Sequence, residues 1–263
     1  MPPGLTDTHA HLCSAEFAAD LEAVLARASA AGVARVVAVG ETLGDARRNL
    51  DLSARHAMIR PAAGLYPAIL DPVQAEALHA FIRAHRPRLC AVGEVGLDFR
   101  VVEDDAGREL QREIFRGFVR LAAELDLPLN VHSRSAGRHA VALLIEEGAA
   151  RVQLHAFDGK ASSALPAVEA EYFFSVPPSI VRSRQKQKLV KHLPLGCLLA
   201  ETDSPVLGPD PGARNEPANL PLSIRAIAEI KSLPEQAVAE AVSENAARLY
   251  GALDSPVPLR LDP

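Results

Sequence analysis

Five consecutive residues near the start of the chain, Asp7-Thr8-His9-Ala10-His11, follow a short apolar run. In an extended strand, successive side chains alternate between two faces, so Asp7, His9 and His11 share one face. Two imidazoles on one face can hold a divalent metal, and a carboxylate beside them can orient a ligand or join the set. The stretch therefore predicts a strand that presents metal ligands at its end; the alternative is a polar strand edge that carries two histidines.

The rest of the chain alternates between β-rich apolar runs and segments of helical periodicity. The predicted strands are Gly4–Thr8, Ala34–Val39, Ile59–Gly64, Cys90–Val95, Leu129–His132, Val152–His155, Tyr172–Val176 and Leu198–Thr202. The predicted helices are Glu16–Ala31, Asp45–His56, Val73–Ala84, Gly107–Leu125, Ala136–Glu147, Ser162–Ala170, Ser183–His192, Asn219–Ile230 and Pro234–Tyr250. Such alternation forms parallel βαβ units, and eight strands close a (β/α)8 TIM barrel.

An open, doubly wound α/β sheet is the alternative architecture. It is disfavoured because the sequence contains no glycine-rich phosphate fingerprint of the GxGxxG or P-loop type. A chain of 263 residues is long enough for one barrel. We expect residues 1–251 to form that barrel and the proline-containing tail, residues 252–263, to lie extended on its surface.

Composition favours a soluble intracellular protein, cytoplasmic or nuclear. The three cysteines, Cys13, Cys90 and Cys197, are far apart and suggest no disulfide framework. No basic segment followed by an apolar run stands at the start, and no apolar run reaches the roughly 18 residues of a membrane span. The net charge of −5 argues against binding nucleic acid through overall charge but leaves room for a local basic patch. We expect a monomer without membrane contact.

Metal-competent residues stand at the carboxyl ends of several predicted strands. They are His9, His11, Glu94, His132, His155 and Asp203. A single histidine at a strand end is usually an ordinary core or surface residue. All six, however, would meet at the mouth of one barrel, where barrel enzymes build their active sites.

Four imidazoles and two carboxylates can hold two divalent ions about 3.5–4 Å apart, with a carboxylate between them. Glu94 is the natural bridge because it has two oxygens to share. Such a pair lowers the pKa of a bridging water and supplies hydroxide near neutral pH. Asp203 can bind a metal and also accept the proton of the water. Mixed nitrogen and oxygen ligands suit zinc, manganese, cobalt or magnesium, and the pattern does not choose among them.

The motifs resemble those of the TatD family of metal-dependent deoxyribonucleases, which belongs to the amidohydrolase-like barrel superfamily. The matching segments occur in order over almost the whole chain: Asp7–His11, Gly93–Asp98, Val131–Arg134, Leu154–Gly159, Glu201–Pro205 and Arg214–Pro217. Three further segments are similar to the third vertebrate TatD-domain paralogue: Asn130–Arg138, Tyr172–Ser179 and Gln185–Val190.

The resemblance implies a (β/α)8 barrel of the metal-dependent hydrolase type and hydrolysis of DNA phosphodiester bonds, at ends or in single strands. It implies 3′→5′ exonuclease activity, and endonuclease activity at abasic sites is also attributed to the family. The ligand pattern of the family falls on the same six residues. One position departs from it, because this chain has Gly64-Leu65-Tyr66-Pro67 where many members have Gly-x-His-Pro. Tyr66 could bond a phosphate oxygen or a metal-bound water, or form an aromatic wall.

A phosphodiester carries negative charge, so hydrogen-bond donors should surround the mouth of the barrel. Candidates follow the later strands, in loops or first helical turns, and with Tyr66 they make up the expected substrate contacts: Ser133, Arg134, Arg138, Lys160, Arg182 and Arg214. The guanidinium fork suits phosphate oxygens. The charged run Arg182–Lys191 has a second interpretation as a solvated helix face, and Arg134 as a loop salt bridge.

Two other functions fit parts of the pattern. The first is a hydrolase of an amide, a lactone or a small phosphoester on the same barrel. Related barrels often carry a carboxylated lysine at strand four, whereas this chain has Glu94 there and arginines around the mouth. The second is a non-catalytic binding protein, which a complete ligand set with a candidate base argues against.

Overall fold

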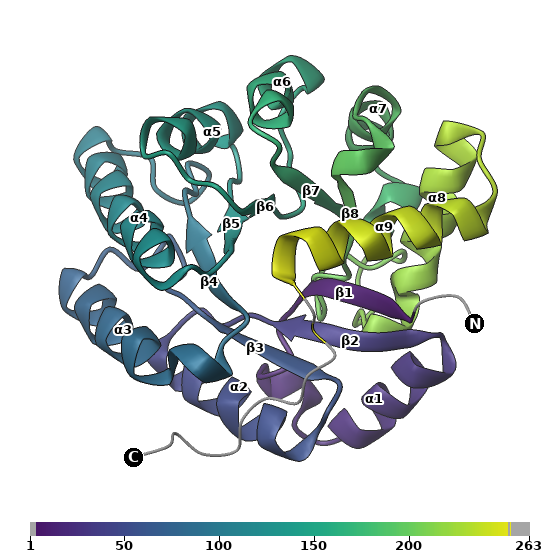
Figure 1. Cartoon of the computed structure of the whole chain (residues 1–263), viewed down its shortest axis with the longest axis horizontal. Helices are drawn as coiled ribbons and strands as arrows, with labels where there is room; N and C mark the ends of the chain where they lie inside the picture. Colours follow the sequence, from purple (N-terminus) through teal and green to yellow (C-terminus); the bar gives the residue numbers. More distant parts are fainter. Residues whose placement is uncertain (1–3, 252, 254–263) are drawn as a thin grey trace.

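Eight parallel strands form the centre of the structure, a computed structural model that describes residues 4–251 and residue 253. Their order in the sheet follows the chain from the first strand to the last, which confirms the barrel and excludes the doubly wound alternative (Figure 1). The strands are β1 (Leu5–Ala10), β2 (Val33–Ala38), β3 (Ile59–Ala63), β4 (Ala91–Gly96), β5 (Leu129–His132), β6 (Val152–Leu154), β7 (Phe173–Val176) and β8 (Leu198–Ala200).

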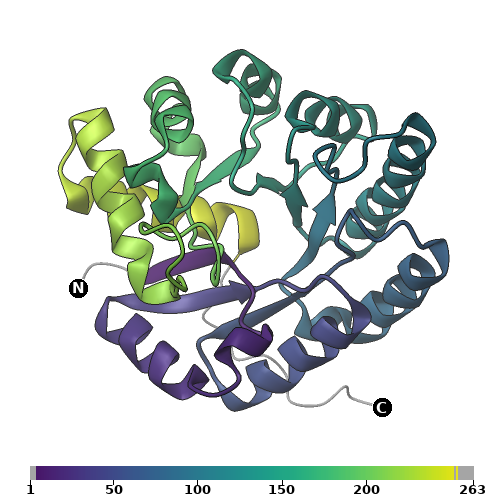
Figure 2. The same cartoon turned by 180° about the vertical axis from the view of Figure 1, so that it is seen from behind.

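Helices cover the strands in both views, and all but the last of them form an outer ring (Figures 1 and 2). They are α1 (Leu21–Ala30), α2 (Leu43–Arg55), α3 (Pro72–His85), α4 (Asp105–Leu125), α5 (Gly137–Glu146), α6 (Ala161–Glu169), α7 (Arg184–His192), α8 (Leu220–Lys231) and α9 (Glu235–Tyr250). Apolar helix residues such as Val24, Leu78, Phe118 and Ile227 are fully buried in the main core. None of the described helices is long and apolar enough to cross a membrane.

The first predicted helix is wrong at its start. Residues Ala15–Phe17 form a separate 3-10 turn, and α1 begins only at Leu21. Asp20 lies between them with φ −141° and ψ 20°, outside the helical region. Its carboxylate is bound by Arg214, which holds the chain in this break. The predicted stop is confirmed, since the chain leaves α1 through Gly32 at φ +87°.

Helix caps explain why other helices begin earlier than the apolar pattern predicts. The side chains of Thr42, Asp71 and Asp104 accept backbone N–H groups of the first turns of α2, α3 and α4. Each such cap is worth about 1 kcal/mol. These polar residues carry no apolar periodicity, so the pattern places the starts of these helices a few residues too late.

The barrel closes between β1 and the loop after β8. The Asp203 N–H donates to the carbonyl of His9 at 2.8 Å. The buried carboxylate of Asp7 accepts the Thr202 N–H at 2.8 Å and also the Thr202 hydroxyl. These bonds therefore fix the position of Asp203 relative to β1.

The opposite end of the barrel is covered by α9, which lies across the strands (Figure 1). The Tyr250 hydroxyl enters the barrel and donates to Gln153 Oε1 at 2.5 Å. Asn130 Nδ2 in turn donates to the Tyr250 hydroxyl and to the carbonyl of Thr8. The predicted tail, residues 252–263, lies outside the described residues apart from Leu253, whose carbonyl accepts a hydrogen bond from Arg60.

Candidate metal-dependent active site

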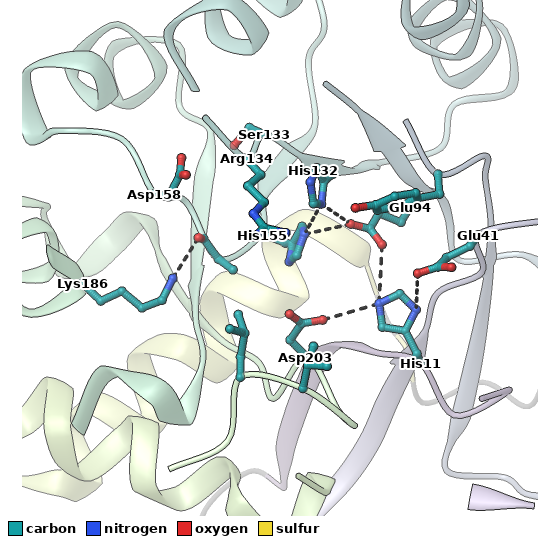
Figure 3. A pocket seen from close by; sticks show the side chains of 14 residues that line it. His11, Glu41, Glu94, His132, Ser133, Arg134, His155, Asp158, Lys186 and Asp203 are labelled. Atoms are coloured by element: carbon teal, nitrogen blue, oxygen red, sulfur yellow. Dashed lines mark hydrogen bonds and ion pairs between the residues drawn. The ribbon is translucent and has the colours of Figure 1, made fainter. Parts of the chain in front are cut away.

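All six predicted ligands meet at the carboxyl end of the barrel, as Figure 3 shows for those that line its cavity. The cavity measures about 410 Å³, within the range of small-ligand sites. His9 is fully buried and does not line the cavity itself. The side chains come from β1, β4, β5 and the segments that follow β1, β6 and β8.

One half of the site is built around the His-x-His pair. The Nε2 atoms of His9 and His11 are 3.2 Å apart. Asp203 Oδ1 lies 3.4 Å from each of them. Glu94 Oε2 lies 3.5 Å from His11 Nε2 and 3.9 Å from His9 Nε2.

The other half faces the second oxygen of the same glutamate. His132 Nδ1 lies 2.6 Å and His155 Nε2 2.9 Å from Glu94 Oε1. These two nitrogens are 3.1 Å apart. Each oxygen of Glu94 thus faces a different pair of imidazoles, which is the arrangement that a bridging carboxylate needs.

The donor atoms fit divalent cations. Two imidazole nitrogens that face each other can share at most one proton, and metal–nitrogen bonds of about 2.0–2.1 Å bring such nitrogens to this kind of separation. Two sets of mutually close ligand atoms contain His9 with Glu94 and His155, and His9 with His11 and Asp203. A third set joins Glu41 to His11 and Glu94.

Further side chains orient the imidazoles. Asn130 Oδ1 lies 2.8 Å from His9 Nδ1 and can only accept, so His9 donates there and keeps Nε2 free for a metal. Asp98 Oδ2 lies 3.0 Å from His132 Nε2 and leaves Nδ1 free in the same way. His155 Nδ1 is buried without a hydrogen-bond partner in the described part of the chain, 3.8 Å from Glu201 Oε2.

In the metal-free protein, the pKa values of the clustered histidines differ widely because each imidazole has different charged neighbours. Burial lowers the pKa of His9, but the hydrogen bond with Asp203 and the charge of Glu94 outweigh it and raise the value to about 10. Burial also lowers the pKa of His132, but the charge of Glu94 and the hydrogen bond with Asp98 outweigh it and raise the value to about 9. Burial and the charge of His9 lower the pKa of His155 to about 4. Against the effect of burial, the surrounding histidines hold the pKa of Asp203 below its ordinary value.

Comparison with known proteins places this geometry in a family. Residues 6–251 match the family described as TatD related DNase. The chain is 45% identical to mouse "Putative deoxyribonuclease TATDN3" over 264 residues, which cover 96% of this chain and 90% of the relative. It is 44% identical to human "Deoxyribonuclease TATDN3" over 259 residues, which cover 94% of each. The chain belongs to the TatD family.

Other TatD relatives extend the comparison. The chain is 31% identical over 258 residues to "3'-5' ssDNA/RNA exonuclease TatD" of Citrobacter rodentium, covering 93% of this chain and 97% of that protein. The crystal structure of YJJV, a TatD homologue from Escherichia coli, superposes with a TM-score of 0.88 at 28% identity, covering 96% of this chain and all of that one. The chain is therefore a metal-dependent TatD deoxyribonuclease, a hydrolase of ester bonds on a TIM barrel, as its motifs predict.

The predicted substrate contacts divide into two groups in this TatD protein. Tyr66 lines the cavity, as do Ser133 and Arg134 (Figure 3). Arg138 and Lys160 are exposed in the first turn of α5 and just before α6, and neither lines it. The last two make other contacts: Arg182 donates to the Gly208 carbonyl, and Arg214 binds Asp20 through both terminal nitrogens.

Asp7 does not join the ligands, although it shares their strand face. Its carboxylate is committed to Thr202 and lies buried below the cavity, where burial raises its pKa to about 7. Its function in the structure is to hold the loop that carries Asp203. The alternation of a strand predicts the face of a side chain, but not how deep in the barrel it lies.

Sequence reasoning missed several residues of the site. Asp98 lies in the quoted Gly93–Asp98 motif, and Asn130 precedes His132 on β5, but neither was given a role. Lys186 belongs to the charged run interpreted as a solvated face. Instead it reaches the cavity and donates to the Ala156 carbonyl at 2.9 Å (Figure 3). The one signal in the sequence was the place of Lys186 in the first turn of a helix capped by Ser183, at the end of the barrel where the site lies.

Glycine is required where β4 meets β5. Gly96 has φ +146°, and a Cβ there would lie 2.0 Å from the carbonyl oxygen of His132. Only glycine combines this backbone with so close an approach. The glycine that follows Glu94 in the motif therefore lets the two ligand-bearing strands lie side by side.

Proposed function

We propose that this TatD protein removes nucleotides from the 3′ end of single-stranded DNA, using two divalent metal ions. The observation that carries this is Glu94, whose two oxygens face separate imidazole pairs on the floor of the cavity. A cavity of about 410 Å³ suits one nucleotide-sized group rather than a length of duplex. The polarity follows the name of the Citrobacter relative.

The metal pair is assigned to residues as follows. His9, His11 and Asp203 would hold one ion, His132 and His155 the other, and Glu94 both. Magnesium, manganese and zinc all fit a nitrogen and oxygen set. When bound, such a pair supplies an activated water and stabilises charge on the attacking and leaving oxygens.

Asp203 is suited to accept a proton in the reaction. Its carboxylate stays ionised at neutral pH because nearby histidines hold its pKa low. It lies at the wall of the cavity, on a backbone tied to the carbonyl of His9. Its fixed position places a proton acceptor beside the ligands of the first ion, where general-base assistance is useful.

Three donors that line the cavity are left for the phosphate. The Ser133 hydroxyl is buried and has no partner among the described residues. Arg134 is exposed at the rim, and Lys186 has one carbonyl partner for its three N–H groups. Together they can bind the oxygens of a phosphodiester, while Arg138 and Lys160 lie further out, where the preceding phosphates of a strand would pass.

Cleavage at abasic sites is a second activity that the cavity favours. Apart from histidines, Tyr66 is the sole aromatic among the described residues that line it. A site without a stacking platform recognises sugar and phosphate more than base. A deoxyribose that lacks its base can enter without flipping a base out of the stack.

The site is complete within one chain, so we propose a monomer. All six candidate ligands belong to the same chain. The three cysteines are free, which favours a reducing compartment such as cytoplasm or nucleus. Analytical ultracentrifugation of the purified protein, with metal bound, tests the monomer.

The function is tested with labelled DNA. A single strand labelled at its 5′ end should shorten stepwise from the 3′ end, and a duplex with one abasic site should be cut at that site. Both activities should stop in excess chelator and return with added manganese or magnesium. Full activity after chelation, with metal shown to be absent, would contradict the proposal. A panel of lactones, cyclic amides and small phosphoesters tests the other hydrolases on this barrel.

A further inference from the structure

We infer that Tyr66 is a positioning residue of the metal site, acting through Asp98 on His132 rather than on the substrate. The inference rests on the proposed two-metal site.

The first observation is a continuous chain of hydrogen bonds. The Tyr66 hydroxyl and His132 Nε2 both lie 3.0 Å from Asp98 Oδ2. The other carboxylate oxygen, Oδ1, accepts the backbone N–H groups of Arg100 and Val101 at 2.9 and 3.2 Å. The Asp98 carboxylate, which is fully buried, is thus fixed by four donors.

The second observation concerns the single hydrogen of the phenol. A carboxylate only accepts, so the Tyr66 hydroxyl is the donor in its bond with Asp98. Its hydrogen is then committed, and the hydroxyl has none left for a phosphate oxygen. A phosphate offers acceptors alone, so the sequence-based expectation of a phosphate contact conflicts with this geometry.

The consequence falls on His132. Because Asp98 accepts from Nε2, the tautomer with a free Nδ1 is favoured, and Nδ1 faces Glu94 Oε1 at 2.6 Å. The ring of Tyr66 also packs edge-on against that of His132, with centroids 5.2 Å apart and planes at 71°. Tyr66 therefore restrains both the carboxylate that selects the tautomer and the rotation of the imidazole.

Removing the hydroxyl should weaken metal binding. Phenylalanine keeps the ring contact but leaves Asp98 Oδ2 with one donor fewer. Partners that orient metal ligands typically contribute 10–100-fold to metal affinity. We expect Tyr66→Phe to lower the affinity for one of the two ions within that range, while KM for single-stranded DNA at saturating metal stays within about twofold.

The experiment titrates metal-free protein with Mn²⁺ by calorimetry and with Co²⁺ by visible absorption. Tyr172→Phe is the matched control, because the Tyr172 hydroxyl donates to the Ala149 carbonyl at 2.8 Å and its residue does not line the cavity. Asp98→Asn is the second variant and should weaken the same ion further and change the Co²⁺ spectrum. The control should match wild type in affinity, spectrum and stability.

Two results would overturn the inference. One is wild-type metal affinity and Co²⁺ spectrum in Tyr66→Phe with a raised KM for DNA, which would make the hydroxyl a substrate contact. The other is an equal loss in Tyr66→Phe and Tyr172→Phe, which would make the effect a general loss of packing. Wild-type protein that binds metal but cuts no DNA would instead refute the proposed function and leave this inference standing.

Discussion

Glu94 has only two oxygens, and the structure aims each at a different group of ligands. Losing this carboxylate removes the shared ligand and leaves concentrated positive charge unbalanced. We therefore expect Glu94→Ala to bind fewer than two ions per chain and to lose DNA cleavage. Metal analysis after dialysis measures it. Glu124→Ala, which removes an exposed carboxylate that pairs with Arg83 and does not line the cavity, is the control and should keep two ions. Two ions and normal turnover in Glu94→Ala would exclude the bridge.

Asp203 combines a ligand position with a proton acceptor. Asparagine nearly matches its shape, so the fold and DNA binding should survive Asp203→Asn. It accepts no proton at neutral pH, and loss of a general base lowers turnover by roughly 10²–10⁴-fold. Single-turnover cleavage of a labelled strand at saturating metal isolates this step. Cleavage within a few fold of wild type would remove Asp203 from both roles.

Arg134 is exposed at the cavity rim and makes no side-chain contact among the described hydrogen bonds and ion pairs. Arg134→Ala should weaken DNA binding more than metal binding. Loss of one phosphate contact should reduce the log–log salt slope by about 0.7 for a single strand. Arg120→Ala on α4 is the control, because that guanidinium pairs with Glu147 at 2.9 Å and does not line the cavity. An unchanged slope and affinity in Arg134→Ala would assign it a structural role.

At the scale of elements, β1 and the loop after β8 depend on each other through Asp7 and Thr202. Thr202→Val keeps the shape but removes the hydroxyl that Asp7 accepts, at a site with no exposure. We expect a loss of about 1–3 kcal/mol in the free energy of unfolding of metal-free protein. Urea denaturation in chelator measures it. Thr6→Val on the same strand is the control and should change stability little; equal losses would show that the Asp7 bond is not the cause.

The elements themselves were readable from sequence because each strand is a short apolar run bounded by helical periodicity. The predictions that were wrong concern features that depend on contacts between residues far apart in the chain. Asp20 breaks the first helix because Arg214 holds its carboxylate. Lys186 looked like part of a solvated face, but its helix turns it toward the Ala156 carbonyl. The meeting of the six candidate ligands at one end of the barrel was predictable because they end parallel strands. The residues that orient them depend on packing inside the barrel.

At the scale of the molecule, metal ions and protons compete for the same imidazole nitrogens. A ligand imidazole must be neutral, whereas in the metal-free protein the pKa of His9 is raised to about 10 and that of His132 to about 9. Both are protonated at pH 7, so binding must displace protons. We expect release of at least one proton per chain at pH 7 and a metal affinity that rises with pH between 7 and 9. Calorimetric titration in two buffers of different ionisation enthalpy measures the release. Heats independent of buffer would contradict it.

The contact between β1 and the loop after β8 also bears on when, during synthesis of the chain, the candidate site can form. Thr202 lies 195 residues after Asp7, so His9 and Asp203, which we assign to the same ion, belong to the earliest and the latest parts of the barrel to be synthesised. A nascent chain, or a proteolytic fragment that ends before Asp203, would carry His9, His11 and Glu94 without Asp203, the other carboxylate that we assign to the same ion. On the proposed assignment, such a partly made or damaged copy has an incomplete site, and we expect DNA cleavage to arise only with the finished barrel.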